Sequence, residues 1–233
     1  MSRAEGSGGG EPTPFDNVPD KLQKRDQWLF WNGSNDKPRK PLNSPTANYG
    51  ASYTDPDEWK AFTEVVEGAQ KVAKAGIGYV TAADNDDYPG GEIAVIDIDG
   101  SFDENGNRKD WVPDLDLFRE AATYIEWSPS HDELGDSGNH IPVYADQIPD
   151  WWKDGHITED GHEGVEVLTN SFSTFTGDMM PGSGSTIAPI DPTPWLFEAY
   201  TELHGEPPRL QAESSDEYDG GEWLEDSHVE NAL

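Results

Sequence analysis

Two acidic residues stand inside a run of sequence that otherwise has the composition of a buried strand. In AVIDIDG, residues 94–100, Asp97 and Asp99 alternate with Ile96 and Ile98. Successive side chains of a strand point to opposite faces, so the two aspartates share one face. Their Cα atoms are then about 6.6 Å apart, at about 3.3 Å per residue. Two short carboxylates at this spacing can converge on divalent metal ions.

The type of ligand predicts which ions these are. Carboxylate oxygens are hard ligands and suit Mg²⁺ or Mn²⁺. Sites that bind two ions for phosphoryl transfer hold them about 3.5–4 Å apart, within reach of both aspartates. A calcium loop of the EF-hand type is excluded, because the sixth position counted from Asp97 is not glycine. The motif alone leaves a second interpretation open, in which both acids face water at the end of a strand.

The composition indicates a folded and strongly acidic protein. The net charge is −32 and the pI is near 4.1, yet nine Trp, eight Tyr and eight Phe are enough to build a core. This aromatic content argues against a disordered acidic protein. A dense acidic surface stays hydrated in concentrated salt, so we expect the high-salt cytoplasm of a haloarchaeon, or a virus of one.

Three absences narrow the class of protein further. The chain has no Cys, which excludes disulfides, thiolate zinc sites and iron–sulfur clusters. No apolar run approaches the roughly 20 residues of a membrane span. The first residues do not have the pattern of a secretory signal peptide, so we expect an intracellular protein without a membrane partner.

Changes in composition along the 233 residues predict one domain with flexible ends. Residues 1–14 are Gly-rich and polar, which is typical of a flexible lead. Residues 206–233 are acidic and rich in turn formers, which predicts a disordered tail. Residues 15–205 are expected to form the folded domain. Nine of the 15 Lys and Arg residues fall between Lys21 and Lys74, which favours a basic functional face.

Periodicity predicts short strands interleaved with a few helices. A helix is expected to begin after Asp55, which caps it, with Pro56 at its first position and Glu58 completing a capping box. Gly76 is expected to end this helix. Further helices are expected at 115–121 and 194–203. Strands are expected at 27–31, 76–82, 94–99, 123–128, 140–145, 163–169 and 171–177. The second and third of these strands are expected to form a hairpin, and the whole pattern indicates an α+β fold.

Further motifs surround the aspartates in the sequence. The segment 124–144, YIEWSPSHDELGDSGNHIPVY, places Ser128, Ser130 and a Gly-x-His that ends in His140 between two strands. The segment 163–178 places Glu166 inside a strand and Thr-Gly after an aromatic strand. Upstream lie an aromatic W-x-x-W strand, a KPRK loop with Lys37, Arg39 and Lys40, a D-P-x-x-W helix start and GIGYV.

In this order, the motifs resemble those of the primase–polymerases of the archaeo-eukaryotic primase superfamily, and in particular those of haloarchaeal phages and plasmids. The resemblance covers about residues 20–180. It implies an RRM-like antiparallel catalytic sheet packed with a smaller α/β unit, with the site in the cleft between them. The implied activity is template-directed nucleotidyl transfer, as primer synthesis or DNA polymerisation, with two divalent ions.

Position by position, the resemblance also implies roles for single residues. Asp97, Asp99 and Glu166 would be the catalytic residues and would bind two Mg²⁺ or Mn²⁺ ions. His140 would contact the triphosphate of the incoming nucleotide, with Ser128 or Ser130 in the same loop. The basic residues of the nucleotide-binding set would be Lys37, Arg39 and Lys40. The implied partners are a DNA template and primer, nucleoside triphosphates and a separately encoded replicative helicase.

A lengthened loop is among the departures of the sequence from this pattern, and two alternatives stay open. HDELGDS, residues 131–137, lengthens the loop between the serines and His140 and adds acids beside the expected triphosphate. A DNA-binding or replication-initiation module that has kept the fold without turnover is therefore one alternative. A haloacid-dehalogenase-like phosphatase is the other, since DIDGS resembles the first motif of those enzymes, where the first Asp is a nucleophile. Against it, about ninety residues precede the motif, whereas those enzymes usually begin near it.

Overall fold

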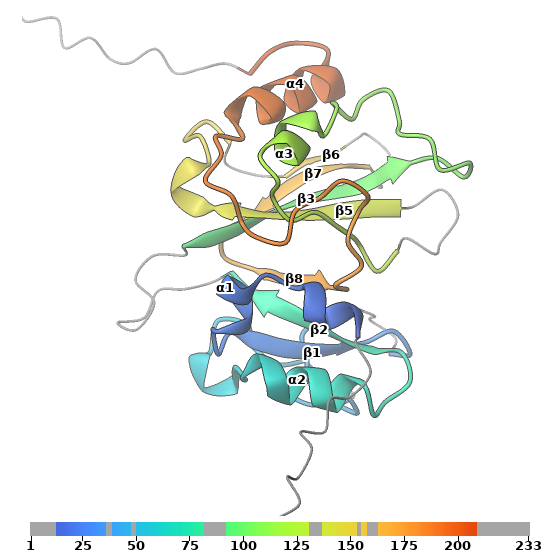
Figure 1. Cartoon of the computed structure of the whole chain (residues 1–233), viewed down its shortest axis with the longest axis vertical. Helices are drawn as coiled ribbons and strands as arrows, with labels where there is room; N and C mark the ends of the chain where they lie inside the picture. Colours follow the sequence, from blue (N-terminus) through green and yellow to red (C-terminus); the bar gives the residue numbers. More distant parts are fainter. Residues whose placement is uncertain are drawn as a thin grey trace, which may run out of the picture.

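The computed structural model describes residues 13–35, 39–47, 50–81, 92–130, 137–152, 155–157 and 163–208. The strands of this part of the chain form two sheets, one of three strands and one of five. In Figure 1 the three-stranded sheet lies in the lower part of the molecule, and the five-stranded sheet lies above it.

The three-stranded sheet combines strands from distant parts of the sequence. Its order is β1 (Trp28–Asn32), β2 (Ala75–Val80) and β8 (Phe172–Phe175), all antiparallel. Helix α2 (Phe62–Ala69) contributes its apolar side to the same core cluster as the aromatic side chains of β1 and β2. The remaining segments of this part are short: η1 (Pro14–Asn17), α1 (Asp20–Gln23) and η2 (Pro56–Glu58).

The five-stranded sheet is also antiparallel, and two helices cover one of its faces. Its order is β4 (Glu126–Trp127), β5 (Ser137–Tyr144), β3 (Ile93–Phe102), β7 (Gly164–Leu168) and β6 (His156–Ile157). Above it in Figure 1 lie α3 (Asp116–Glu120) and α4 (Thr193–His204), whereas η3 (Ala145–Gln147) follows β5. Ile96 and Ile98 of β3 share a core cluster with Phe118 of α3 and Leu196 of α4.

The opposite face of β3 changes character along the strand. Ile93 and Val95 lie in the core cluster that also contains Trp28, Tyr79 and Phe175 of the three-stranded sheet. The next two residues on this face are Asp97, which is half-buried, and Asp99, which is exposed. The apolar half of the face therefore packs the two sheets together, and the acidic half begins where this packing ends.

The α+β class and the antiparallel arrangement of the strands agree with the prediction from the sequence. The predicted hairpin is wrong, because β2 pairs with β1 and β8, whereas β3 pairs with β5 and β7 in the other sheet. The predicted strand at 123–128 is also shorter, since only Glu126 and Trp127 form β4. Across the described ranges, no helix has both the length and the apolar character that crossing a membrane requires.

The helix predicted from Asp55 onward is divided into two segments. Asp55 caps only the short η2, where its side chain accepts a hydrogen bond from the Asp57 backbone N–H. The capping box is wrong, because the Glu58 carboxylate accepts a hydrogen bond from the N–H of Ser52 at 2.6 Å. The backbone is extended at Trp59, and Lys60 pairs with the backbone of β1 before α2 begins. Pairing with β1 therefore outweighs the helical periodicity of this segment.

Gly76 does not end a helix but makes room for an aromatic ring inside β2. It lies opposite Trp31 in β1, and a Cβ atom there would lie 2.3 Å from two indole carbons. We expect Gly76→Ala to lower the free energy of unfolding by about 1–3 kcal/mol, because the ring has to move. Denaturant unfolding followed by Trp fluorescence measures this change.

Gly33→Ala is the matched control, because the nearest atom to a Cβ at Gly33 is 3.5 Å away. An alanine that fits this backbone is expected to leave the free energy of unfolding unchanged or to raise it by about 0.4–1 kcal/mol. Equal effects of the two substitutions would contradict the packing role of Gly76.

Candidate metal centre

Strand pairing places four ionisable residues in one row across the five-stranded sheet. Glu126 on β4 pairs with His140 on β5, His140 with Asp97 on β3, and Asp97 with Glu166 on β7. Directly opposed residues of antiparallel strands point to the same face, with Cβ atoms about 4.5–5.5 Å apart. Asp99 lies two residues further along β3 on this face, opposite Gly164. The row and Asp99 thus gather four carboxylates and one imidazole on the face turned toward the three-stranded sheet.

The structure brings together the three acids that the sequence analysis grouped. One carboxylate oxygen from each of Asp97, Asp99 and Glu166 lies within 4.8 Å of the other two. Oxygens on opposite sides of an octahedral Mg²⁺ are about 4.2 Å apart, at about 2.1 Å per bond. Small side-chain rotations are therefore enough to bring all three carboxylates onto one ion. Within the described residues, no second group of three such ligands is found.

Of the three acids of the triad, Asp97 is the least exposed to solvent. Its Oδ1 atom is buried and has no hydrogen bond, although Nε2 of His140 lies 3.4 Å away as a partner for an ion pair. A buried carboxylate oxygen without a hydrogen bond is costly unless a cation neutralises it. The His140 ring supplies part of this neutralisation, and the oxygen has no hydrogen bond that would compete with a bound metal ion.

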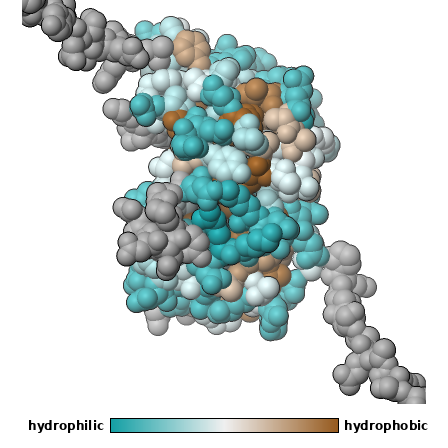
Figure 2. Space-filling view, turned by 60° about the vertical axis from the view of Figure 1, so that its left-hand side comes forward, coloured by the Kyte–Doolittle hydropathy of each residue, from teal (hydrophilic) through white to brown (hydrophobic). Residues whose placement is uncertain are grey.

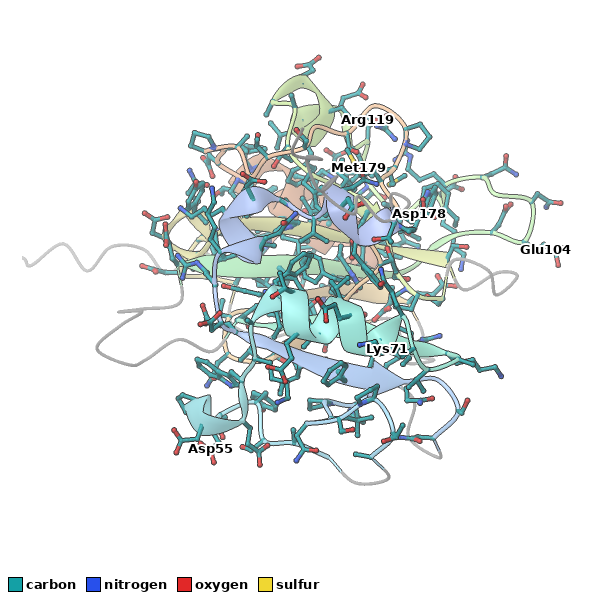
Figure 3. The ribbon with its side chains drawn as sticks, turned by 60° about the horizontal axis from the view of Figure 1, so that its bottom comes forward. Asp55, Lys71, Glu104, Arg119, Asp178 and Met179 are labelled. Atoms are coloured by element: carbon teal, nitrogen blue, oxygen red, sulfur yellow. The ribbon has the colours of Figure 1, made fainter. Side chains whose placement is uncertain are left out.

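A buried carboxylate on β4 holds the other side of the imidazole ring. Nδ1 of His140 lies 3.2 Å from Oε1 of Glu126, a residue with no exposed surface. Glu126 also accepts hydrogen bonds from the hydroxyl of Tyr124 at 2.5 Å and from the backbone N–H groups of Thr176 and Gly177 at 2.8–3.2 Å. Asp178 and Met179, which follow this turn, are labelled in Figure 3, well away from Asp55 and Lys71 in that view.

The two carboxylates control the protonation of the groups between and beside them. Burial lowers the pKa of His140, but the charges of Asp97 and Glu126 outweigh this effect and raise the pKa to about 10. The ring is therefore an imidazolium at neutral pH, which donates a hydrogen bond from Nδ1 to Glu126 and pairs through Nε2 with the charge of Asp97. Burial and the adjacent Glu126 also raise the pKa of Tyr124 well above its usual value, which keeps its hydroxyl a donor.

Glu166 experiences two opposing influences. Partial burial and the charge of Asp97 raise its pKa, and the charge of Lys40 lowers it. Lys40 of the basic loop is therefore close enough for its charge to act on Glu166. The like-charge effect of Asp97 is the kind of repulsion that a divalent cation between the two carboxylates removes.

A glycine before β6 leaves the space in which Glu166 lies. A Cβ atom at Gly155 would lie 2.7 Å from Cγ and 2.8 Å from Oε1 of Glu166. We expect Gly155→Ala to push this flexible side chain out of the triad and to weaken Mn²⁺ binding about tenfold. Isothermal titration with Mn²⁺ measures the affinity, and Gly33→Ala is again the control. Because the side chain can move, the free energy of unfolding is expected to change by less than about 0.5 kcal/mol. An unchanged affinity would contradict a ligand role for Glu166.

The remaining residues of the predicted nucleotide-binding set are placed in different ways. Ser128 and Ser130 are buried, and their hydroxyls are 2.6 Å apart, beside the loop that leads to β5. Lys40 is exposed and Arg39 is half-buried in the loop before Leu42. Lys37 and residues 131–136 of the lengthened loop lie outside the described residues. The contact of His140 with a triphosphate stays a prediction, because both of its nitrogens face carboxylates here.

Two residues of the centre were missed in the sequence. Glu126 is the one acidic residue inside the predicted strand 123–128, and this was the available signal. Gly155 gives no local signal, since its role depends on the pairing of β6 with β7. Comparison of the chain with protein-family models and with curated proteins finds no match. The candidate metal centre therefore rests on its own geometry.

Proposed function

We propose that this protein is a metal-dependent nucleotidyltransferase of the primase–polymerase kind, which extends or makes a primer on a DNA template. The observation that carries the proposal is the convergence of Asp97, Asp99 and Glu166 within 4.8 Å on one face of an antiparallel sheet. The resemblance of the motifs to those of archaeo-eukaryotic primases supports the choice of reaction. The proposal includes two Mg²⁺ or Mn²⁺ ions, one in the triad and one brought by the nucleotide.

Each group of residues has a task in this proposal. Asp97, Asp99 and Glu166 would hold one of the two ions, and the ions would neutralise charge on the transferring phosphoryl group and favour ionisation of the attacking 3′-hydroxyl. Lys40, whose charge lowers the pKa of Glu166, is proposed to contact a phosphate. Positioning and charge neutralisation are the main requirements of phosphoryl transfer, and a rigid sheet satisfies the first of them.

The acidity of the protein is compatible with this activity in concentrated salt. Figure 2 shows a face on which hydrophilic residues predominate, and the net charge is −32. In molar salt the release of counterions contributes little to DNA binding. Binding then depends on metal bridges and local basic residues, so we place the protein in the high-salt cytoplasm of an archaeon, with a separately encoded helicase as a partner.

The test is extension of a labelled primer on a DNA template in molar KCl, with Mg²⁺ or Mn²⁺ and with dNTPs or rNTPs. Extension that follows the template sequence and stops with EDTA is the expected result. Binding of the template without extension would overturn the proposal and favour the replication-initiation module. Template-independent hydrolysis of a phosphomonoester, with a covalent phosphate on Asp97, would instead identify a phosphatase.

A further inference from the structure

The imidazole of His140 is held so that it can orient Asp97. Its exposed fraction is only 3%, and the ring lies between two carboxylates. Nδ1 is 3.2 Å from Glu126, and Nε2 is 3.4 Å from Asp97. Rotation of the ring would break both contacts. Asp97 is at the same time the acid that lies between His140 and Glu166 in the row of paired strands.

Glu126 is itself fixed from three directions. Besides His140 it has the Tyr124 hydroxyl and two backbone N–H donors, of Thr176 and Gly177, and these are the first residues after β8. This turn packs closely against the N-terminal segment, because a Cβ atom at Gly177, whose φ is 71°, would lie 2.1 Å from the carbonyl oxygen of Pro14. A continuous chain of contacts therefore runs from the end of β8 through Glu126 and His140 to Asp97.

We infer that Glu126 and His140 are positioning residues of the metal centre, which fix the Asp97 carboxylate in the orientation that binds the ion and tie this orientation to the Thr176–Gly177 turn. The inference rests on the proposed function only in that Asp97 is a metal ligand. Outer partners that orient a ligand typically contribute a factor of about 10–100 in metal affinity or activity. In this role His140 acts through Asp97 and does not contact the nucleotide.

The first measurement is Mn²⁺ affinity of the full chain without nucleotide, from the electron paramagnetic resonance signal of free Mn²⁺. The variants are Glu126→Gln and His140→Gln. Tyr79→Phe is the matched control, since it removes one buried hydrogen bond, from Tyr79 to Gln27, in the other sheet. We expect Mn²⁺ affinity to fall about 10–100-fold in both site variants and to stay at the wild-type value in the control.

The second measurement separates the positioning role from a purely structural one. In primer extension the site variants are expected to lose kcat about 10–100-fold at saturating Mn²⁺, with the KM for the nucleotide unchanged. If His140→Gln fails to fold because it leaves Glu126 buried without a cation, the double variant Glu126→Gln/His140→Gln gives the same two readouts without that charge.

The outcomes separate this inference from the proposed function. Wild-type Mn²⁺ affinity in both site variants, with a raised KM for the nucleotide, would overturn the inference and assign His140 to the triphosphate. Wild-type protein that binds no Mn²⁺ would overturn it as well. If the wild type extends no primer and the site variants still bind Mn²⁺ more weakly than the wild type, the positioning role stands and the polymerase activity is rejected.

Discussion

Replacement of Asp99 by asparagine is expected to lower primer extension about a thousandfold, with the fold intact. A bound metal ion contributes several kcal/mol of charge stabilisation, and each 1.36 kcal/mol corresponds to a factor of ten in rate. Asp99 is the most suitable of the three acids for this test, because it is exposed and lies outside the buried contact between Asp97 and His140. Single-turnover extension at saturating nucleotide measures the change.

A stability measurement on the same variant tests the cause of this loss. Without metal, Asp99→Asn is expected to raise the melting temperature slightly, because one of three neighbouring carboxylate charges is removed. The stabilisation that Mn²⁺ gives the wild type through binding to the folded state is expected to be largely lost. Glu120→Gln on α3 is the control, since this exposed acid lies on the helix-covered side of the sheet. Equal stabilisation of all three proteins by Mn²⁺ would reject the triad as the binding site.

Replacement of His140 by glutamine is expected to destabilise the metal-free protein by about 3–5 kcal/mol at pH 7. The substitution removes the only charged partner that the structure gives to the buried Glu126 among the described residues. An uncompensated buried charge is far more costly than the loss of a surface ion pair. Urea unfolding in the presence of EDTA measures the loss, because a bound cation would otherwise replace the imidazolium as the partner of Asp97.

The effect of this substitution is expected to depend on pH, with a defined sign. The pKa of His140 is raised from about 6.5 in the unfolded chain to about 10 in the folded protein. The contribution of the imidazolium is therefore complete below pH 6.5 and falls as the pH rises toward 10, by up to about 1.4 kcal/mol per pH unit. The difference in unfolding free energy between wild type and His140→Gln should accordingly shrink between pH 7 and pH 9.5. A difference that stays constant over this range would show that His140 is neutral in the folded protein.

A conservative second substitution isolates the pair. In the Glu126→Gln background, His140→Gln should cost much less than in the wild type, because the fully buried charge of Glu126 is then absent. Additive effects of the two substitutions would mean that the two side chains do not interact.

The positions of Asp97 and Asp99 could be predicted from the sequence because strand alternation is a local property. Their shared face follows from their spacing alone. The approach of Glu166 depends on the register between β3 and β7, which no local pattern fixes. The grouping of Glu166 with Asp97 and Asp99 was expected only from the resemblance of the motifs to those of primases.

Glu126 was missed for a different physical reason. Both faces of this part of the sheet are covered, so Tyr124 and Ile125 are both fully buried and lie in different core clusters. A strand that is buried on both faces shows no clear alternation of apolar and polar residues. Its one acidic residue then looks like an ordinary solvated side chain, although it has no exposed surface.

The predicted hairpin and the long predicted helix failed because distant partners outweighed local signals. Strand β2 has the aromatic and β-branched residues of a hairpin strand, so pairing with β3, the next strand in the sequence, was predicted. It pairs instead with β1 and with the distant β8. Similarly, Lys60 lies in a segment of helical periodicity and still pairs with Trp28. Tertiary pairing commonly overrides weak propensities of this kind.

The return of β8 to the first sheet has a consequence for folding. Ile77 pairs with Phe175, 98 positions later in the sequence, so this contact forms only after a long loop has closed. Contacts between residues so far apart in the sequence slow folding. During synthesis, the edge of β2 that pairs with β8 stays unpaired until β8 has left the ribosome. The Thr176–Gly177 turn, which donates to Glu126, directly follows β8. The contacts that support the candidate metal centre through Glu126 are therefore expected to form late in folding.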